Sequence, residues 1–346
     1  MQSTKKQNLV AEINQYGQSE VNLVERAIPE VQNNDVLVEV VAASVNPVDL
    51  KIIEGKLKLI LKYKMPLRVG SDFSGKVVKV GSNVKNYQVG DYVYGRVQKD
   101  RMGTFTNYLV VNEGDLALKP QNLTFEEAAS LPLVALTSYQ VLHEAMQIKP
   151  GDRVLIQAGS GGIGTVAIQL AKLAGAEVAT TTSTKNVALV KELGADHVID
   201  YRKENFAEKL RDYDYVFDTL GGQNLENAFK VVKPGGKVVT ISGIPDAKFA
   251  RSYGLPRWKQ ALFAIASHKI TKLARQAKAD YSFWFMRPDG KILAQITQLV
   301  EENKLRPIID STFTFKQTQA ALDYSRKGHA RGKIVIDINQ DLSKEK

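Results

Sequence analysis

The stretch that decides the fold runs from Leu155 to Ala171 and reads LIQAGSGGIGTVAIQLA. Its apolar start is typical of a buried strand, its glycines of a tight turn, and the residues from Thr165 onward of a helix. Backbone N–H groups at the start of such a helix, together with the helix dipole, bind a phosphate group. The sequence therefore predicts a dinucleotide site at this turn, made by Gly161, Gly162, Ile163 and Gly164.

The residues around and after this turn alternate between strand and helix patterns, which is typical of a parallel sheet covered by helices. The predicted strands are residues 154–157, 177–181, 197–199, 215–218, 236–241 and 281–285. The predicted helices are residues 184–193, which Gly194 ends, 225–232 and 292–299. A strand at 313–315, a helix at 317–326 and a strand at 333–338 complete the chain. We predict an α/β protein with a doubly wound parallel sheet.

The N-terminal part has a different pattern, with short period-two stretches broken by Gly, Asn and Pro. Residues 36–42, 75–81 and 91–95 are predicted strands of a barrel-like β domain that ends near Pro120. Thr124 and Glu127 then form the pattern of a capping box, which predicts the start of a helix.

Composition excludes several classes of function. The 346 residues contain no cysteine, which excludes disulfides, thiol nucleophiles and cysteine-bound metals. The four histidines are far apart and show no metal-ligand spacing. The formal net charge of +10 comes from Lys and Arg that alternate with Asp and Glu along the chain. This spread indicates a solvated basic surface rather than a nucleic-acid partner.

The sequence shows no signal-peptide pattern and no apolar stretch long enough to span a bilayer. We therefore expect a cytoplasmic protein without a membrane partner. Residues 245–287 form a longer connection than a simple crossover needs, and residues 258–278 carry apolar residues at helical spacing with basic residues between them. Such a helix could bind a membrane or a partner, but we favour a packed helix with a solvated face.

Several separated motifs follow one another along the chain: NPVD at 46–49, VGSDFSG at 69–75, LTSY at 136–139, GADHVIDY at 194–201 and GKIVI at 332–336. In this order they resemble the zinc-free quinone and enone oxidoreductases of the medium-chain dehydrogenase/reductase superfamily. The resemblance covers nearly the whole chain and implies a Rossmann-type sheet joined to a β-rich GroES-like barrel domain. We expect a GroES-like catalytic domain at 1–123, a dinucleotide-binding domain at 124–303, and a return to the catalytic domain at 304–346.

The chain departs from the zinc-dependent branch of that superfamily. Asn46 stands where the resemblance places the first cysteine ligand, and Ser71 and Asp72 replace a His-Glu pair. A tetrahedral catalytic zinc cannot be built from these residues, so we predict no metal site.

The cofactor prediction rests on a missing acid. In dinucleotide-binding folds, an Asp or Glu about 20 residues after the glycine turn holds the ribose hydroxyls of NAD. Here that position falls in residues 181–186, which carry hydroxyls and a lysine but no acid, and Glu177 lies too early in the strand. We predict NADPH, with Thr182, Ser183 and Lys185 on the 2′-phosphate. The alternative is that these residues cap the next helix.

The resemblance also implies further contacts. The remaining cofactor-binding residues are Tyr201, Asp218, Ser242, Gly243, Ile244, Gly332 and Lys333, and the catalytic residues are Asn46, Asp49, Lys51 and Thr137. The alternatives are ordinary packing for Tyr201 and Thr137, and a solvated surface turn for Lys51.

These residues favour NADPH-dependent reduction of a small electrophile, a quinone or an α,β-unsaturated carbonyl compound, by metal-free hydride transfer. The alternative is a non-catalytic NADPH-binding protein with an RNA-binding or regulatory role. We expect a monomer or a homodimer.

Overall fold

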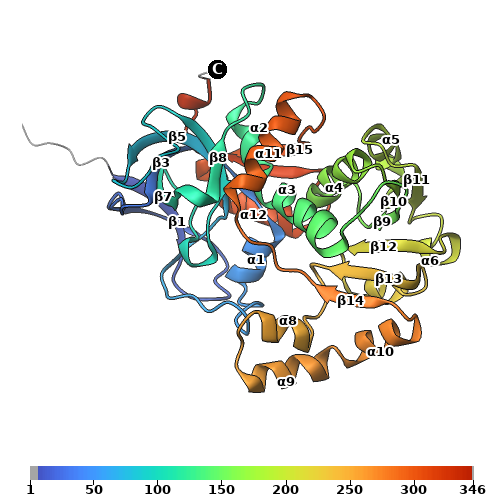
Figure 1. Ribbon diagram of the computed structural model, residues 1–346. Helices are drawn as coiled ribbons and strands as arrows, with labels where there is room; N and C mark the ends of the chain where they lie inside the picture. The colour runs from blue at the N-terminus through green and yellow to red at the C-terminus, as the bar shows by residue number, and fades with distance from the viewer. Residues whose placement is uncertain (1–6, 345–346) are drawn as a thin grey trace, which may run out of the picture. The chain divides into compact units, whose positions relative to one another are not determined.

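The computed structural model describes residues 7–344 (Figure 1). Its contacts divide the chain into unit 1, which comprises Met1–Leu136 and Arg287–Lys346, and unit 2, which comprises Thr137–Met286. The sequence analysis places the first division earlier along the chain, after residue 123, and the second division later, after residue 303. The difference arises because helices α2 (Phe125–Ala129) and α11 (Gly290–Glu301) pack on strands of unit 1.

Unit 1 consists mainly of strands, as its period-two pattern predicts. One sheet has the order β15-β16-β3-β5-β6-β8, with β7 paired to β3, and a smaller sheet has the order β2-β1-β4. The larger sheet contains β3 (Asp35–Val45), β5 (Asp72–Val80), β6 (Tyr92–Arg96), β7 (Tyr108–Asn112), β8 (Leu116–Leu118), β15 (Ile309–Thr314) and β16 (Lys333–Asp337). The smaller sheet contains β1 (Asn8–Ile13), β2 (Asn22–Arg26) and β4 (Leu67–Arg68).

The helices of unit 1 cover these strands. They include α1 (Pro47–Ile53), α12 (Thr318–Arg326), α2, α11 and the first part of α3 (Pro132–Tyr139). The predicted capping box is confirmed, since the Thr124 hydroxyl accepts the Glu127 N–H and the Glu127 carboxylate accepts the Thr124 N–H. Helix α2 thereby begins where Phe125 is buried against the sheet.

Unit 2 contains the predicted doubly wound sheet, in which every pair of neighbouring strands is parallel. The order is β11-β10-β9-β12-β13-β14, so the chain starts at a central strand and moves outward first to one side and then to the other. The strands are β9 (Arg153–Ile156), β10 (Glu177–Thr182), β11 (His197–Asp200), β12 (Tyr213–Asp218), β13 (Val232–Thr240) and β14 (Asp280–Phe283).

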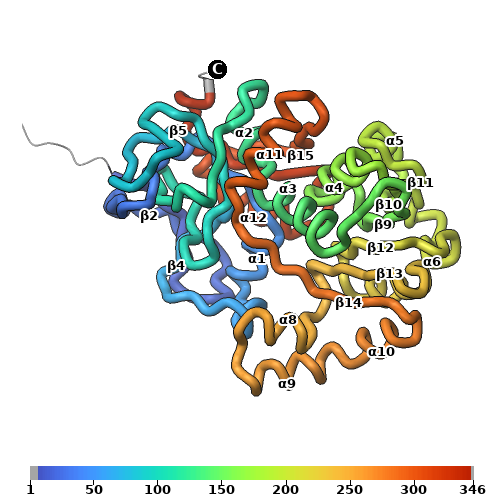
Figure 2. Tube along the Cα trace, in the orientation of Figure 1, coloured from blue at the N-terminus to red at the C-terminus, as the bar shows by residue number. Residues whose placement is uncertain are grey.

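The helices of unit 2 follow the strands along the chain (Figure 2). They are α4 (Gly162–Leu173), α5 (Val187–Glu192), α6 (Phe206–Lys209), α7 (Gly222–Ala228), α8 (Ala247–Ser252), α9 (Arg257–Ala266) and α10 (His268–Gln276), after a π-helical turn at Gln140–Met146.

Two helix predictions are wrong in part. The helix predicted at 225–232 ends at Ala228, and β13 already begins at Val232, because Val232 pairs with Tyr213 of the neighbouring strand. The helical pattern at 258–278 corresponds to two helices that meet at Ser267 rather than to one.

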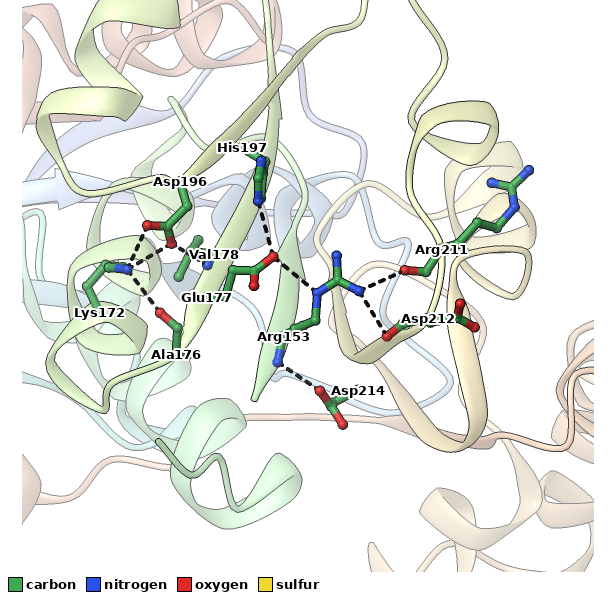
Figure 3. Close-up of polar contacts among 10 residues, drawn as sticks. All are labelled: Arg153, Lys172, Ala176, Glu177, Val178, Asp196, His197, Arg211, Asp212 and Asp214. Carbon is green, nitrogen blue, oxygen red and sulfur yellow. Dashed lines mark hydrogen bonds and ion pairs between the residues drawn. The ribbon is translucent and has the colours of Figure 1, made fainter. Parts of the chain in front are cut away.

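Charged residues connect the amino ends of the parallel strands (Figure 3). Glu177, the first residue of β10, accepts a hydrogen bond from the Arg153 guanidinium at 3.1 Å, and its Oε1 lies 3.1 Å from Nε2 of His197. Asp196 accepts hydrogen bonds from Lys172 and from the Val178 N–H. Glu177 therefore lies at the opposite end of β10 from Thr182, as the sequence analysis expects.

Candidate functional site

The glycine turn of unit 2 leads directly from β9 into α4. The first helical hydrogen bond runs from the Thr165 N–H to the Gly161 carbonyl at 3.0 Å, so the N–H groups of Gly162 and Ile163 precede the bonded ladder. A Cβ on Gly164 would lie 2.4 Å from the Ala158 carbonyl oxygen, so the helix can approach the strand this closely only at a glycine. The turn has the geometry of a phosphate-binding turn.

Hydroxyl and amide groups join this turn to the carboxyl end of β10. The Thr182 hydroxyl donates to Oγ of Ser160 at 2.9 Å, and the Asn186 amide donates to the same oxygen at 3.0 Å and to Oγ of Ser183 at 3.2 Å. The structure thus brings the predicted Thr182 and Ser183 beside the turn. It adds Ser160, which lies inside the quoted glycine stretch but was given no role there, and Asn186, which no motif marks.

The capping alternative for this segment does not describe its hydrogen bonds. Ser183 precedes the short 3₁₀ helix Thr184–Asn186 without a side-chain cap, and the Thr182 hydroxyl is directed to Ser160. Lys185 is exposed within that 3₁₀ helix.

A carboxylate that the sequence analysis missed lies on the neighbouring strand. Asp200 pairs in register with Thr182, so it reaches the same edge of the sheet. Its oxygens accept the Thr184 hydroxyl at 2.6 Å and the Arg202 N–H at 3.1 Å. The pKa of Asp200 lies below its usual value, and the hydrogen bond from the Thr184 hydroxyl is the largest cause. Asp200 lies beside Thr182 because their two strands pair. Counting residues forward from the glycine turn does not reveal this pairing.

The predicted residues at the ends of β12 and β13 belong to one hydrogen-bond network, in which Asp218 and Thr240 are buried. The Asp218 carboxylate accepts the Thr240 hydroxyl at 2.5 Å and the Gly221 N–H at 2.9 Å. The Thr240 hydroxyl oxygen accepts the N–H groups of Gly243, at 2.8 Å, and of Ser242, at 3.2 Å. Asp218 therefore fixes the loops that follow both strands.

The remaining predicted residues of unit 2 differ in exposure. Tyr201 is 61% exposed, which does not fit ordinary packing, and its N–H donates to the Thr182 carbonyl at 3.1 Å. Ile244 is 40% exposed, and its carbonyl accepts the Tyr281 hydroxyl. Thr137 is buried in α3.

Unit 1 brings Asn46, Asp49 and Lys333 into one buried cluster. The Lys333 ammonium donates to Oδ1 of Asn46 at 2.5 Å and to the Val45 carbonyl at 3.2 Å. The Asn46 amide donates to Oδ2 of Asp72 at 2.9 Å, and that oxygen lies 3.6 Å from the Lys333 ammonium. All four named side chains are at least nine-tenths buried.

Asp49 joins this cluster from the first turn of α1. Its Oδ2 accepts the Asn46 N–H at 2.8 Å, and its Oδ1 accepts the Ser71 hydroxyl at 3.0 Å. The predicted Lys51 follows two residues later, so it lies on the other side of the helix, where it is half-buried.

Gly332 sets the position of Lys333. Its φ is +91°, and a Cβ there would lie 2.2 Å from the Ile308 carbonyl oxygen, which accepts the Lys333 N–H. A glycine is therefore required where β16 starts beside the preceding strand.

Burial dominates the electrostatics of the cluster. It raises the pKa of Asp49 to about 7, with the nearby Asp72 charge acting in the same direction. Burial also raises the pKa of Asp72 and lowers that of Lys333, while the attraction between these two groups opposes both shifts. The buried Arg96 guanidinium also attracts the Asp72 carboxylate.

Two family models match the chain. The alcohol dehydrogenase GroES-like domain matches residues 32–121, and the zinc-binding dehydrogenase model matches residues 193–336. A 2-methylene-furan-3-one reductase of Solanum lycopersicum is 36% identical over 333 residues, which cover 93% of this chain and 76% of that protein. The chain belongs to the medium-chain dehydrogenase/reductase superfamily. The predicted family and the Rossmann-type and GroES-like fold class are confirmed.

Other members of the superfamily are similar over most of their length. The NADPH-dependent alkenal/one oxidoreductase, chloroplastic, of Arabidopsis thaliana is 35% identical over 319 residues, 89% of this chain and 73% of that protein. The structure of the quinone oxidoreductase from Coxiella burnetii has a TM-score of 0.83 at 32% identity and covers 96% of this chain and 100% of its own. These names support oxidoreductase activity and a nicotinamide cofactor.

The location of this dehydrogenase/reductase is a separate question. Within residues 7–344, no helix has the length and apolar character that crossing a membrane requires. The cytoplasmic location stays a prediction, since the Arabidopsis relative is named as chloroplastic.

The zinc ion that one matched description implies does not fit the residues found here. The sequence has no cysteine. The Lys333 ammonium lies beside the hydrogen-bonded Asn46 and Asp72 side chains, and this positive charge repels a divalent cation. Among residues 7–344, no three His, Cys, Asp or Glu side chains gather as a metal site would need.

The raised pKa of Asp49 predicts a pH-dependent stability. Ionising this carboxyl is penalised in the folded state, so the protonated carboxyl contributes to the free energy of unfolding. This contribution is complete below the unfolded pKa near 4 and is lost as pH rises through about 7. The Asp49→Asn variant should lack this pH-dependent contribution. As the pH rises over that range, the unfolding free energy of the native protein should fall relative to that of the variant by up to about 4 kcal/mol.

Urea unfolding of both proteins measures this difference in unfolding free energy. The measurements should cover about pH 4.5 to 8, the range over which these pKa values place the change. The exposed Asp323→Asn is the matched control. If Asp49→Asn and the native protein show the same slope with pH, Asp49 does not titrate as described.

Proposed function

We propose that this chain reduces quinones or α,β-unsaturated carbonyl compounds with NADPH, by a hydride transfer that needs no metal ion. The observation that carries the proposal is the buried Lys333 ammonium bound to Asn46, which stands where the zinc-dependent branch would need its first metal ligand. The names of the tomato and Arabidopsis relatives, a 2-methylene-furan-3-one reductase and an NADPH-dependent alkenal/one oxidoreductase, support this substrate class.

Conjugated acceptors suit a site without a Lewis acid. A quinone or an enone delocalises the incoming charge onto its oxygen, whereas a saturated carbonyl or an alcohol depends on external polarisation. The protein then has to orient the double bond, exclude water and supply a hydrogen-bond donor to the developing enolate.

The glycine turn and the end of β10 are the residues that would hold the cofactor. The N–H groups of Gly162 and Ile163, which precede the hydrogen-bonded ladder of α4, would bind the pyrophosphate. Ser183 and Lys185 would bind the 2′-phosphate, with Thr182 held in place by Ser160. Tyr201 would cover the adenosine, and the Asp218 network would shape the loops at the ribose and nicotinamide.

Bound NADPH supplies a hydride, which an enone accepts at its β-carbon before a proton is added at the α-carbon. Lys51 would donate a hydrogen bond to the substrate oxygen. Asp49 would act on Lys51 indirectly, since its bonds to Asn46 and Ser71 fix the start of α1. Lys333 would act as a positioning residue for Asn46, because its ammonium lies in the buried cluster.

The substrate proposal predicts the product. NADPH oxidation should be seen with quinones, alkenals or cyclic enones, and enones should give the saturated carbonyl compound. The activity should withstand metal chelators, because the Lys333 ammonium beside Asn46 and Asp72 would repel a divalent cation there. Product analysis after incubation with EDTA measures both points. An alcohol formed from a saturated aldehyde would contradict the proposal, as would salt-sensitive RNA binding without turnover of any electrophile.

The cofactor proposal predicts the effect of Lys185→Ala. Losing a charge-assisted hydrogen bond to the 2′-phosphate should lower kcat/KM for NADPH by about 10- to 100-fold and leave that for NADH nearly unchanged. Steady-state kinetics with both cofactors measures this preference. Lys191→Ala, an exposed lysine of α5, is the matched control. Equal losses with both cofactors would contradict the 2′-phosphate contact, and the nearby Asp200 would then favour NADH.

The catalytic proposal predicts the effect of Lys51→Ala. Removing the donor to the enolate oxygen should lower kcat by about 100-fold with little change in protein stability. Lys56→Ala is the control, since Lys56 is exposed just beyond α1 and pairs with Glu54. Kinetics close to those of the native enzyme would show that Lys51 is a solvated surface residue.

A further inference from the structure

The segment from Ala247 to Ala279 carries most of the excess positive charge of the chain, so the even spread of charges described in the sequence analysis does not hold there. It contains no Asp or Glu. Its basic residues are Lys248, Arg251, Arg257, Lys259, Lys269, Lys272, Arg275 and Lys278. Since the whole chain has a net charge of +10, the segment that contains α8, α9 and α10 is strongly positive compared with the rest.

Helix α10 directs its charges outward. Ile270 and Ala274 are buried in the core of unit 2, with Tyr281 and Phe229 among their neighbours. The opposite face carries Lys269, Lys272 and Arg275, all exposed, with Lys269 paired to Glu226. This helix is therefore the packed helix with a solvated basic face that the sequence analysis favours.

Helix α9 is different, because its apolar residues point to the surface. Phe263 is its one buried residue. Trp258, Leu262 and Ile265 are 62%, 40% and 76% exposed, and their spacing of four and three residues places them on one face. We name Trp258, Leu262 and Ile265 the apolar stripe. Burial in unit 2 does not account for it.

We propose that α9 and α10 bind unit 2 to the surface of an anionic phospholipid bilayer, with the apolar stripe inserted among the lipids. The exposed stripe replaces the expectation that the protein has no membrane partner. A helix of this kind lies in the plane of the interface, with its apolar side chains in the acyl boundary and its basic residues among the headgroups. Tryptophan favours that depth, and Lys and Arg are attracted by the negative surface potential.

Two other occupants fit the same surface less well. A second copy bound about a twofold axis would bring the basic segment against itself, so like charges would face one another. A nucleic acid would satisfy the basic residues but would leave the aliphatic Leu262 and Ile265 in water. A bilayer with negative headgroups satisfies both the charge and the apolar stripe.

Vesicle sedimentation of the full chain tests the proposal. Binding should be at least about tenfold tighter to phosphatidylcholine vesicles that contain about 40% phosphatidylglycerol than to pure phosphatidylcholine, and added salt should weaken it. The double variants Trp258→Ser/Ile265→Ser and Lys272→Glu/Arg275→Glu should each lose at least about tenfold in affinity. Lys149→Glu/Lys191→Glu, exposed lysines outside α8–α10, changes the charge equally and should retain binding.

Tryptophan fluorescence provides a second readout. The sequence has two tryptophans, so Trp284→Phe leaves Trp258 as the single emitter. Its emission should shift to shorter wavelength on anionic vesicles and be quenched by brominated acyl chains. Absence of quenching would overturn the insertion of the apolar stripe.

Three other results would overturn the proposal. The first is equal binding to neutral and anionic vesicles, and the second is binding to poly(U) RNA but not to vesicles. The third is a protein that does not bind vesicles and forms a dimer that Ile265→Ser dissociates. A comparable loss in the Lys149→Glu/Lys191→Glu control would also overturn it, since net charge and not this surface would then set the affinity.

Discussion

The buried ammonium of Lys333 is the contact on which the arrangement of unit 1 depends. It joins β16, near the C-terminus, to Asn46 at the start of α1 and, through the Asn46 amide, to Asp72 of β5. Removing one partner of such a buried set leaves an uncompensated charge, which costs about 3–5 kcal/mol. The start of α1, with Asp49, is therefore held by a residue almost 290 positions away.

In unit 2 the corresponding constraint is the close approach of helix α4 to strand β9. The missing side chain at Gly164 permits it, and the turn leaves N–H groups of the first helical residues available. The hydroxyl groups of Thr182 and Ser160 then connect the turn to β10. One strand-to-helix junction thus positions both the groups proposed to bind phosphate and the residues that would distinguish the two nicotinamide cofactors.

Much of this was predictable because it depends on local sequence. The capping box at Thr124, the parallel strands and the turn before α4 follow from short-range preferences and periodicity. The predictions failed where two local patterns were equally compatible with the residues. Val232 continues a helical spacing, but its pairing with Tyr213 makes it part of a strand. Similarly, the break at Ser267 has no glycine or proline to mark it.

The sequence by itself determined the glycine turn before α4, the superfamily and the absence of cysteine ligands, because these depend on which residues occur and in what order. The tertiary structure decided which distant groups share one environment. Lys333 was predicted as a cofactor contact and lies in the cluster with Asn46 and Asp72, and Asp200 reaches the edge of the sheet beside Thr182. Strand pairing and burial create these contacts, and neither leaves a signal in the residues near them along the chain.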